Sequence, residues 1–223
     1  MKYNNEKNIK YIINKIFNGK KIKENFIVIH SSTIPFRLNH NDVKIFWKEL
    51  RKFLGNKVTI IMPSFSFNFG KSKIWDYYKT KSEMGILTEY FRKKISNTRS
   101  IHPIHSVVYY GPMSNKIPNH DCSSSFGKNS VWDWICNRED VLNVSMGLGL
   151  IGGAAFVHYA EELVQVPYRE YVKLNGKVYD NFGNLLKKNF TYFARKEFKN
   201  KIVKNYFELV EKDLIKNGIM TKK

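Results

Sequence analysis

The residue pair best placed to do chemistry is His158 with Glu161, in the segment FVHYAEE. Residues three apart on a helix lie on one face, with about 5 to 6 Å between their Cβ atoms. A carboxylate at that distance can hold one imidazole nitrogen and leave the other free to accept a proton. A helical His with a Glu one turn later is more often a surface pair, but the preceding GLGLIGGAA favours a site, since glycine lets a ligand approach the backbone closely. The pair is therefore a candidate general base with its supporting carboxylate.

A second cluster of polar residues occurs in the segment NTRSIHPIHS, which precedes a predicted strand. Arg99 and Ser100 have the donors that bind phosphate oxygens. His102 has two readings, a buried imidazole held by the backbone or a direct ligand contact. His102 and His105 do not indicate a metal site, because no carboxylate or cysteine stands at ligand spacing and Pro103 interrupts any helix that would align them. The segment is therefore a candidate phosphate-binding site.

Two loops that follow predicted strands also carry polar groups. The loop HSST follows the apolar run FIVI and precedes a predicted helix, where backbone and hydroxyl donors can turn toward phosphate oxygens. The loop PSFSFNFG follows VTIIM and would suit an apolar wall with polar tips. Both loops are expected beyond the carboxyl ends of strands, where open α/β sheets bind ligands.

The elements that position these loops form a strand, helix, strand unit in the first third of the chain. Residues 26–30 and 58–63 are short apolar runs that fit buried strands of a parallel sheet. Between them, Asp42 is placed to cap a helix with an apolar face, and Gly55 to end it. A right-handed βαβ crossover is therefore expected.

The rest of the chain continues this alternation of helices and strands. We expect helices near residues 9–17, 82–95, 154–164 and 205–218, strands at 106–111 and 141–147, and a hairpin at 169–180 with its turn at Asn175-Gly176. The predicted fold class is α/β, a three-layer αβα arrangement with a mostly parallel central sheet. With 223 residues and 43% hydrophobic content, residues 1–223 are expected to form a single domain.

The charge balance predicts an anionic partner. The chain has 38 Lys and Arg against 19 Asp and Glu, a formal net charge of +19, which attracts anions and repels polycations. Because the basic residues are spread through all segments, a smaller phosphorylated ligand is favoured over nucleic acid. No apolar stretch is long enough to span a membrane, no secretory signal occurs at the N-terminus, and Cys122 and Cys136 form no disulfide framework. A cytoplasmic protein without a membrane partner is expected.

Taken in order, these motifs resemble the antibiotic N-acetyltransferase family, typified by the aminoglycoside 3-N-acetyltransferases. The resemblance covers most of the chain and rests on the order and spacing of the segments IVIHSS (27–32), VTIIMPSFS (58–66), SEMGILTEYFR (82–92), TRSIHPIHSVVYYG (98–111), FGKNS (126–130), VLNVSMGLG (141–149) and HYAE (158–161).

The resemblance implies a three-layer α/β enzyme that uses acetyl-CoA, with pantetheine and phosphates near the HSS loop and the TRSIHP segment. It implies that His158 deprotonates the acceptor amine with support from Glu161, and that the amine attacks the thioester directly. The candidate residues for coenzyme A binding lie in these two segments and near the cofactor entrance: His30, Ser31, Ser32, Arg37, Arg99, Ser100 and His102. Cys122 beside His120 is a less favoured covalent alternative.

The sequence departs from the family pattern in the loop after HSS, near its C-terminus and on the acceptor side. TIPFRLN, with Arg37, replaces a glycine-containing stretch, and the chain stops soon after IKNG, where a homo-oligomer partner could supply an edge of the fold. Aminoglycosides are polycations that need clustered carboxylates, yet SFSFNFGKSKIW has no Asp or Glu. We therefore expect an anionic acceptor, an amino sugar carried on a nucleotide diphosphate.

Two other functions stay open at this level. One is an aminoglycoside 3-N-acetyltransferase that confers antibiotic resistance, the activity for which the family is known. The other is a non-catalytic, basic nucleic-acid-binding protein that kept the fold, which the net charge of +19 allows. The retained His158, Glu161, Arg99 and Ser100 disfavour the second, because a bare scaffold needs none of them.

Overall fold

The centre of the fold is a sheet of five strands in the order β4-β5-β2-β1-β6. The computed structural model describes residues 5–19, 21–96, 98–118, 123–153, 155–196 and 207–222. The strands of this sheet are β1 (Phe26–Ser31), β2 (Thr59–Pro63), β4 (Thr98–Arg99), β5 (Val107–Tyr110) and β6 (Val141–Met146). Because β1 is parallel to β2 and β6, whereas β5 is antiparallel to β2 and β4, β5 alone runs against the other four. The predicted α/β class with a mostly parallel central sheet is confirmed.

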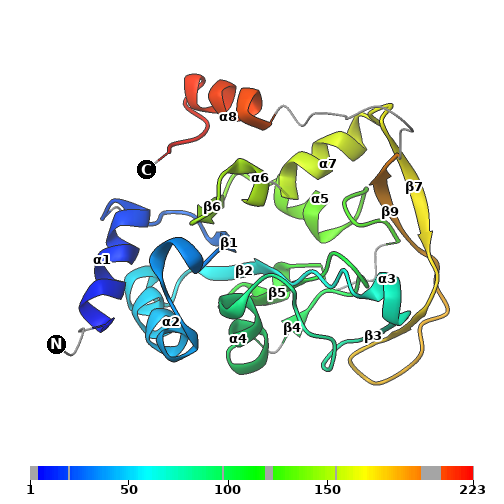
Figure 1. The fold of residues 1–223 in the computed structure, drawn as a ribbon, viewed down its shortest axis with the longest axis horizontal. Coiled ribbons are helices and arrows are strands. Elements are labelled where there is room, and N and C mark those ends of the chain that lie inside the picture. The colour runs from blue at the N-terminus through cyan, green and yellow to red at the C-terminus, as the bar shows by residue number, and fades with distance from the viewer. Residues whose placement is uncertain are drawn as a thin grey trace.

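Helices and short strands surround this sheet (Figure 1). The helices are α1 (Asn5–Phe17), α2 (His40–Leu54), α3 (Phe69–Ser72), α4 (Ile86–Lys94), α5 (Val131–Cys136), α6 (Leu150–Gly153), α7 (Ala155–Leu163) and α8 (Phe207–Lys216), with short 3₁₀ turns η1 (Ile34–Phe36) and η2 (Ser114–Lys116). The short strands are β3 (Ile74–Asp76), β7 (Arg169–Leu174), β8 (Lys177–Tyr179) and β9 (Phe190–Arg195). None of the helices in the described part of the chain has the length and apolar character that crossing a bilayer requires.

The first crossover has the predicted strand, helix, strand order, with α2 connecting the parallel neighbours β1 and β2. The sequence predicts Asp42 as the cap of α2, but the N-cap residue is Asn39. The Asn39 side chain accepts a hydrogen bond from the backbone N–H of Asn41, while the Asp42 carboxylate accepts one from the backbone N–H of Asn39. In such a capping box the acidic residue stands at the third helical position, so Asp42 stabilises the helix start from inside the helix.

Alternate side chains of β1 pack against different sets of helices. Ile27 and Ile29 belong to a buried cluster with side chains of α1, α2 and α4. Phe26 and Val28 belong to another, with side chains of α5 and α7. All four side chains are buried, which explains why the sequence of β1 is a continuous apolar run. Successive side chains of a strand point to opposite faces, so they alternate between the two clusters.

The predicted hairpin at residues 169–180 is wrong. β7 pairs antiparallel with β9, which comes later in the chain, and β8 pairs parallel with β3. Val178 of β8 is buried in a small core with Trp75 of β3. The chain passes so close to this core that a Cβ at Gly176 would lie 2.5 Å from the carbonyl oxygen of Lys73. The local turn signal is real, but burial of apolar surface around Trp75 decides the pairing.

The predicted helices near the end of the chain correspond to α7 and α8. α7 begins directly after Ala154, which lies outside the described residues. No residue of α8 is buried, although its carboxylate Glu211 accepts a hydrogen bond from the backbone N–H of Leu150 at the start of α6, at 3.1 Å. This contact fixes one side of α8 to the helices that lead into the candidate site.

Candidate active site

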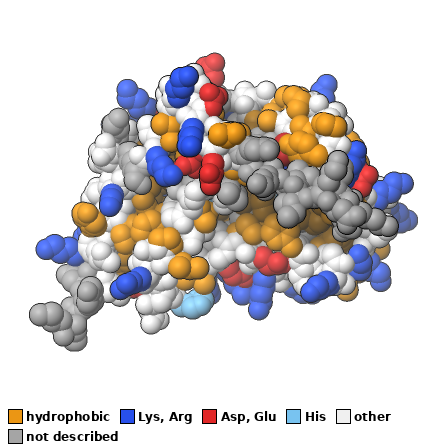
Figure 2. All heavy atoms as spheres, turned by 45° about the horizontal axis from the view of Figure 1, so that its top comes forward, with side chains coloured by type: hydrophobic (Ala, Val, Ile, Leu, Met, Phe, Trp, Pro, Cys, Tyr) orange, Lys and Arg blue, Asp and Glu red, His pale blue; other side chains and the backbone are white. Residues whose placement is uncertain are grey.

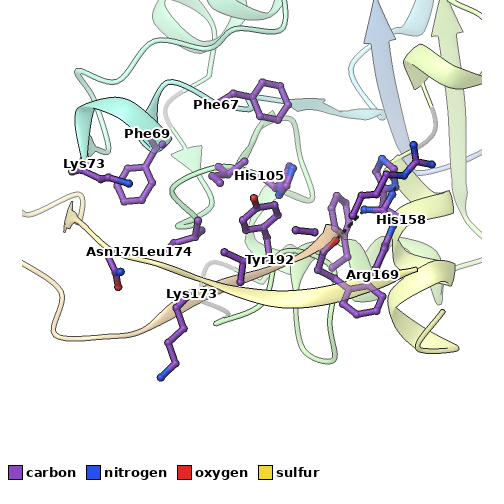
Figure 3. Close-up of a pocket in the computed structure, with 17 residues that line it drawn as sticks. Phe67, Phe69, Lys73, His105, His158, Arg169, Lys173, Leu174, Asn175 and Tyr192 are labelled. Carbon is purple, nitrogen blue, oxygen red and sulfur yellow. Dashed lines mark hydrogen bonds between the residues drawn. The ribbon is translucent and has the colours of Figure 1, made fainter. Parts of the chain in front are cut away.

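A cavity of about 490 Å³ lies beyond the carboxyl ends of β2 and β4. Its walls come from the loops after these strands, from α7 and from the ribbon of β7 and β9 (Figure 3). The residues that line it are Phe67, Phe69, Gly70, Lys73, Ile104, His105, Phe126, His158, Arg169, Val172, Lys173, Leu174, Asn175, Tyr192, Phe193, Ala194 and Arg195. The loop PSFSFNFG therefore contributes an aromatic wall at the edge where α/β sheets bind ligands, as predicted.

His158 and Glu161 form the predicted pair on α7. His158 lines the cavity, and its Nδ1 lies 2.7 Å from Glu161 Oε2. A carboxylate can only accept hydrogen bonds, so Nδ1 carries the shared proton and Nε2 keeps its lone pair. Nε2 is thus the atom that can take a proton from a bound amine.

Glu161 is itself held by the segment that follows α7. The Tyr168 hydroxyl donates to Glu161 Oε1 at 2.9 Å, and Arg169 Nη2 donates to Oε2 at 2.8 Å. Arg169 Nη2 lies 3.2 Å from His158 Nδ1 because both bind the same oxygen. Burial by itself raises the pKa of this carboxyl, but hydrogen bonds from His158 and Tyr168 and the charge of Arg169 outweigh it and lower the pKa to about 2. Glu161 is therefore ionised at neutral pH and fixes the tautomer of His158.

The wall of the cavity is positively charged. Its basic residues are Lys73, Arg169, Lys173 and Arg195, of which Lys173 points its side chain away from the cavity (Figure 3). No Asp or Glu occurs among the described residues that line it. Glu161 lies behind His158, where Arg169 matches its charge. A ligand that enters this space meets cationic and aromatic groups.

Arg99 does not line the cavity. Only 2% of it is exposed, and all five of its side-chain N–H groups donate within the protein: to the carbonyl oxygens of Ser64, Tyr77 and Thr80 and to the hydroxyls of Ser66 and Ser106. Burial lowers the pKa of Arg99 to about 9, which leaves it charged at neutral pH. Ser100 is buried as well, and its Oγ accepts from the backbone N–H of Val107 at 2.9 Å. The predicted phosphate site at these two residues therefore has no free donor on Arg99.

The sequence allows two roles for His102, a buried imidazole held by the backbone or a direct ligand contact. The structure shows the buried imidazole. Its Nδ1 accepts from the backbone N–H groups of Ile104 and His105, at 3.2 and 3.0 Å, and its Nε2 lies 3.1 Å from the carbonyl oxygen of Thr191. Both ring nitrogens are therefore used inside the protein. His105, three residues later, lines the cavity.

The HSS loop continues from the end of β1. Two of its buried polar atoms, His30 Nε2 and Ser31 Oγ, have no hydrogen-bond partner among the described residues. Ser32 Oγ accepts from the backbone N–H of Ile34 at 3.4 Å, and Arg37 is exposed. Unpartnered buried polar atoms are costly unless a ligand satisfies them. His30 Nε2 and Ser31 Oγ are therefore candidates for hydrogen bonds to a ligand, although neither residue is in the lining of the cavity.

The glycines before α7 serve close packing of α6 on the sheet. A Cβ at Gly153 would lie 1.8 Å from a serine hydroxyl of β6 and 3.5 Å from Cβ of His30. From there a series of rings leads to the cavity, with centroid separations of 6.1, 5.7 and 5.6 Å along His30, Trp132, Phe126 and His158. The HSS loop and the general-base candidate are thus parts of one packed region.

The covalent alternative finds no support in the described cysteine. Burial, followed by the nearby charge of Asp133, raises the pKa of the Cys136 thiol to about 12, so a thiolate is disfavoured at neutral pH. Cys122 and His120 lie outside the described residues.

The buried histidines predict a pH-dependent stability. Burial lowers the pKa of His30 and of His102 from 6.5 to about 4, so the unfolded chain binds protons between these values while the folded protein does not. The free energy of unfolding should therefore fall as the pH drops from about 7 toward 5, with a slope of up to about 1.4 kcal/mol per pH unit for each histidine. Urea unfolding at several pH values measures it. His102→Gln should reduce the slope, whereas His40→Gln, at an exposed position of α2, should not; equal slopes in all three proteins would contradict the assignment.

Comparison with known proteins gives the same answer as the motifs. Residues 28–223 match the sequence model of a family described as aminoglycoside 3-N-acetyltransferase. A search of curated proteins found no match. Among solved structures, the YokD protein from Bacillus subtilis is 22% identical with a TM-score of 0.68, over 91% of this chain and 84% of that one.

Two further solved structures have a similar fold. The aminoglycoside acetyltransferase AAC(3)-IVa, as an apoenzyme, is 20% identical with a TM-score of 0.69, over 94% of this chain and 76% of that one. AAC-IIIb, in a binary complex with CoASH, is 14% identical with a TM-score of 0.74, over 94% and 85%. At such identities these likenesses show the fold. Together with the match of the family over residues 28–223, they establish that this chain belongs to the aminoglycoside 3-N-acetyltransferase family, enzymes that transfer an acetyl group from acetyl-CoA to an amine.

Proposed function

We propose that this enzyme acetylates an anionic amine, an amino sugar carried on a nucleotide diphosphate, with His158 as the general base. The observation that carries the proposal is the composition of the cavity lining beside His158, which includes Lys73 and Arg195, besides the Glu161-bound Arg169, and no described Asp or Glu. A polycation in this space would meet like charges without a carboxylate to offset them. A diphosphate would be attracted by the same groups and by the net charge of +19.

The geometry supports direct transfer. Acetyl-CoA supplies an acetyl group that is already activated as a thioester. The acceptor nitrogen forms a bond to the acetyl carbonyl carbon, and the C–S bond of the thioester breaks. His158 Nε2 takes the proton that the nitrogen loses, while the ionised Glu161 stabilises the imidazolium that forms. The imidazolium then gives this proton to the departing sulfur, and coenzyme A leaves as the free thiol. Arg169 and Tyr168 keep the carboxylate in place. A bound pair of substrates supplies the proximity, so no acyl-enzyme is required.

For the cofactor side, we propose that the HSS loop holds acetyl-CoA through His30, Ser31 and Ser32, with Arg37 at the entrance. The unpartnered Nε2 of His30 and Oγ of Ser31 support this assignment. Arg99, Ser100 and His102 take part as the buried frame of the neighbouring loops and not as direct phosphate contacts. A single three-layer αβα domain in the cytoplasm, with a homo-oligomer as an open alternative, stays our prediction for the whole chain.

The second candidate is an aminoglycoside 3-N-acetyltransferase that confers antibiotic resistance. Its support is the family itself and the likeness to AAC-VIa, a relative whose structure holds sisomicin. A nucleic-acid-binding role is less well supported, because on the face shown in Figure 2 lysine and arginine side chains are spread around the surface and do not gather in one stripe.

The experiment compares three acceptors of different charge. Thiol release from acetyl-CoA is followed with a free amino sugar, the same sugar linked to a nucleotide diphosphate, and kanamycin. The nucleotide-linked sugar should have the highest kcat/KM. Lys73→Glu, at a side chain that lies beside Phe69 in Figure 3, should lower that value by about 10-fold and leave the free sugar nearly unchanged. The reason is that a charge reversal at the wall costs roughly 1 kcal/mol or more against an anion.

The matched control is Lys44→Glu, at an exposed position of α2 on a helix that does not line the cavity. It makes the same change in net charge and should leave all three acceptors unaffected. Efficient acetylation of kanamycin, improved by Lys73→Glu, together with no reaction of the nucleotide-linked sugar, would overturn the anionic acceptor in favour of the aminoglycoside.

A further inference from the structure

His105 is the second histidine of the cavity wall (Figure 3). A chain of hydrogen bonds inside the protein ends at its ring. The chain runs from the carbonyl oxygen of Thr191 on β9 through His102 and Ser125 to His105 Nδ1. Each member has a limited choice of donor and acceptor roles, so the positions of the protons follow from the geometry.

The first proton to be placed is that of His102. Its Nδ1 accepts from two backbone N–H groups, those of Ile104 and His105, so this nitrogen carries no proton. A neutral His102 then has its proton on Nε2, which points at the carbonyl oxygen of Thr191 at 3.1 Å and at Ser125 Oγ at 3.3 Å. Toward Ser125, His102 is therefore a donor.

The second proton is that of the Ser125 hydroxyl. Ser125 is 3% exposed, so its O–H needs an acceptor inside the protein. His102 Nε2 is a donor and cannot accept it, whereas His105 Nδ1 lies 2.7 Å from Oγ. Ser125 therefore donates to His105 Nδ1, and a neutral His105 carries its own proton on Nε2.

The surroundings of His105 are apolar and keep it neutral. Its ring contacts the rings of Phe65 and Phe126, with centroids 4.8 and 4.9 Å away, and lies near Phe67 and Tyr192. Burial, followed by the neighbouring charges, lowers its pKa well below the ordinary value. A hydrogen bond donated in such apolar surroundings is stronger than one donated in bulk water.

We propose that His105 is an acceptor-binding residue, a fixed N–H donor that holds an oxygen of the acceptor while His158 Nε2 faces the acceptor nitrogen. The two histidines of the wall then have opposite tautomers: Glu161 fixes the proton of His158 on Nδ1, and Ser125 fixes that of His105 on Nε2. One ring accepts a proton and the other donates a hydrogen bond. The inference rests on the proposed function only in that an amine acceptor enters this cavity, and it holds for an amino sugar or an aminoglycoside.

The first test reads the tautomers without any turnover. Nitrogen-15 NMR of the histidine side chains at neutral pH should show His105 with its proton on Nε2 and His158 with its proton on Nδ1. Ser125→Ala removes the donor to His105 Nδ1 and should leave His105 as a mixture of tautomers. Ser64→Ala is the matched control, since Ser64 is a buried serine whose Oγ has no hydrogen-bond partner among the described residues, and it should leave the His105 tautomer unchanged.

The second test separates acceptor binding from the rest of the reaction. His105→Leu should raise KM for the acceptor by about 10-fold or more, because the N–H donor to an oxygen of the acceptor is lost. The affinity for acetyl-CoA, measured by calorimetry, should stay unchanged. His105→Gln keeps an N–H donor at a similar reach and should recover most of the loss. Ser125→Ala should give an intermediate KM.

Several outcomes would overturn the inference. A proton on His105 Nδ1 in the wild-type protein is one, and an unchanged acceptor KM in both His105→Leu and Ser125→Ala is another. A loss of acetyl-CoA affinity in these variants would assign His105 to the cofactor side instead. If no amine in the panel is acetylated, the proposed function fails, while the NMR result still decides the tautomer on its own.

Discussion

Replacing His158 with alanine is expected to lower kcat by about 10²-fold or more and to leave the affinity for acetyl-CoA nearly unchanged. The reason is the geometry of the pair: Glu161 holds Nδ1 at 2.7 Å, and Nε2 is the atom left to take the proton of the attacking amine. Thiol release measures kcat, and calorimetry measures the binding of acetyl-CoA.

The control for this variant is His40→Ala, at an exposed histidine of α2 that is not part of the cavity. It should behave as the wild-type enzyme. Unaltered turnover in His158→Ala would remove His158 from the role of base. An equal loss of acetyl-CoA binding and turnover would instead place His158 on the cofactor side.

Replacing Arg99 with leucine is expected to lower the free energy of unfolding by about 3 kcal/mol or more. The side chain is 2% exposed and donates all five N–H groups to protein oxygens, so the substitution leaves several buried acceptors without a partner, at about 1–3 kcal/mol each. Arg99→Lys should also be strongly destabilising, because an ammonium has three donors and cannot reproduce the planar fork. Urea unfolding of both variants measures the effect.

Arg195→Leu is a useful comparison for Arg99→Leu, since Arg195 lies in the cavity wall and is exposed. It should cost much less stability. If Arg99→Lys folds as stably as the wild type but binds acetyl-CoA more weakly, Arg99 is a phosphate contact, as its position in the sequence first indicates, and the structural role given to it here is wrong.

Much of the fold could be predicted because its signals are local. The apolar runs of β1 and β2 and the apolar face of α2 are complete within short segments, and the parallel pairing follows from their order. The hairpin at residues 169–180 was predicted from an equally local turn signal. The turn signal does not decide the pairing there. Burial of Val178 against Trp75 stabilises the pairing of β8 with β3 more than a hairpin with β7 would. A contact between segments so far apart in the sequence leaves no mark in either one.

The residues of the candidate site also fall into those that the sequence predicts and those that it does not. His158 and Glu161 could be paired from the sequence because helix geometry fixes their separation. The sequence does not predict the roles of Tyr168, Arg169 and Ser125. These residues come from other segments, which contain no pattern that indicates contact with His105 or with the pair of His158 and Glu161. His105 had a signal, its place in NTRSIHPIHS, but its neighbours decide what it does.

Arg99 shows the opposite error. A charged residue beside a strand end reads as a ligand contact, and only the folded chain reveals that carbonyl oxygens of three other residues already surround it. The loop SFSFNFGKSKIW has no Asp or Glu, which can be seen in the sequence without any knowledge of the fold. The residues of β7 and β9 that line the cavity also include no Asp or Glu.

The most direct measurement of the central claim is a competition in one reaction, with acetyl-CoA, a nucleotide-linked amino sugar and kanamycin at equal concentrations. Mass spectrometry of the products reports which amine gains an acetyl group, and His158→Ala is run beside the wild type. We expect the nucleotide-linked sugar to be acetylated first, kanamycin to remain mostly unmodified, and His158→Ala to form little of either product. Acetylated kanamycin with an untouched nucleotide-linked sugar, or equal product from His158→Ala, would contradict the account.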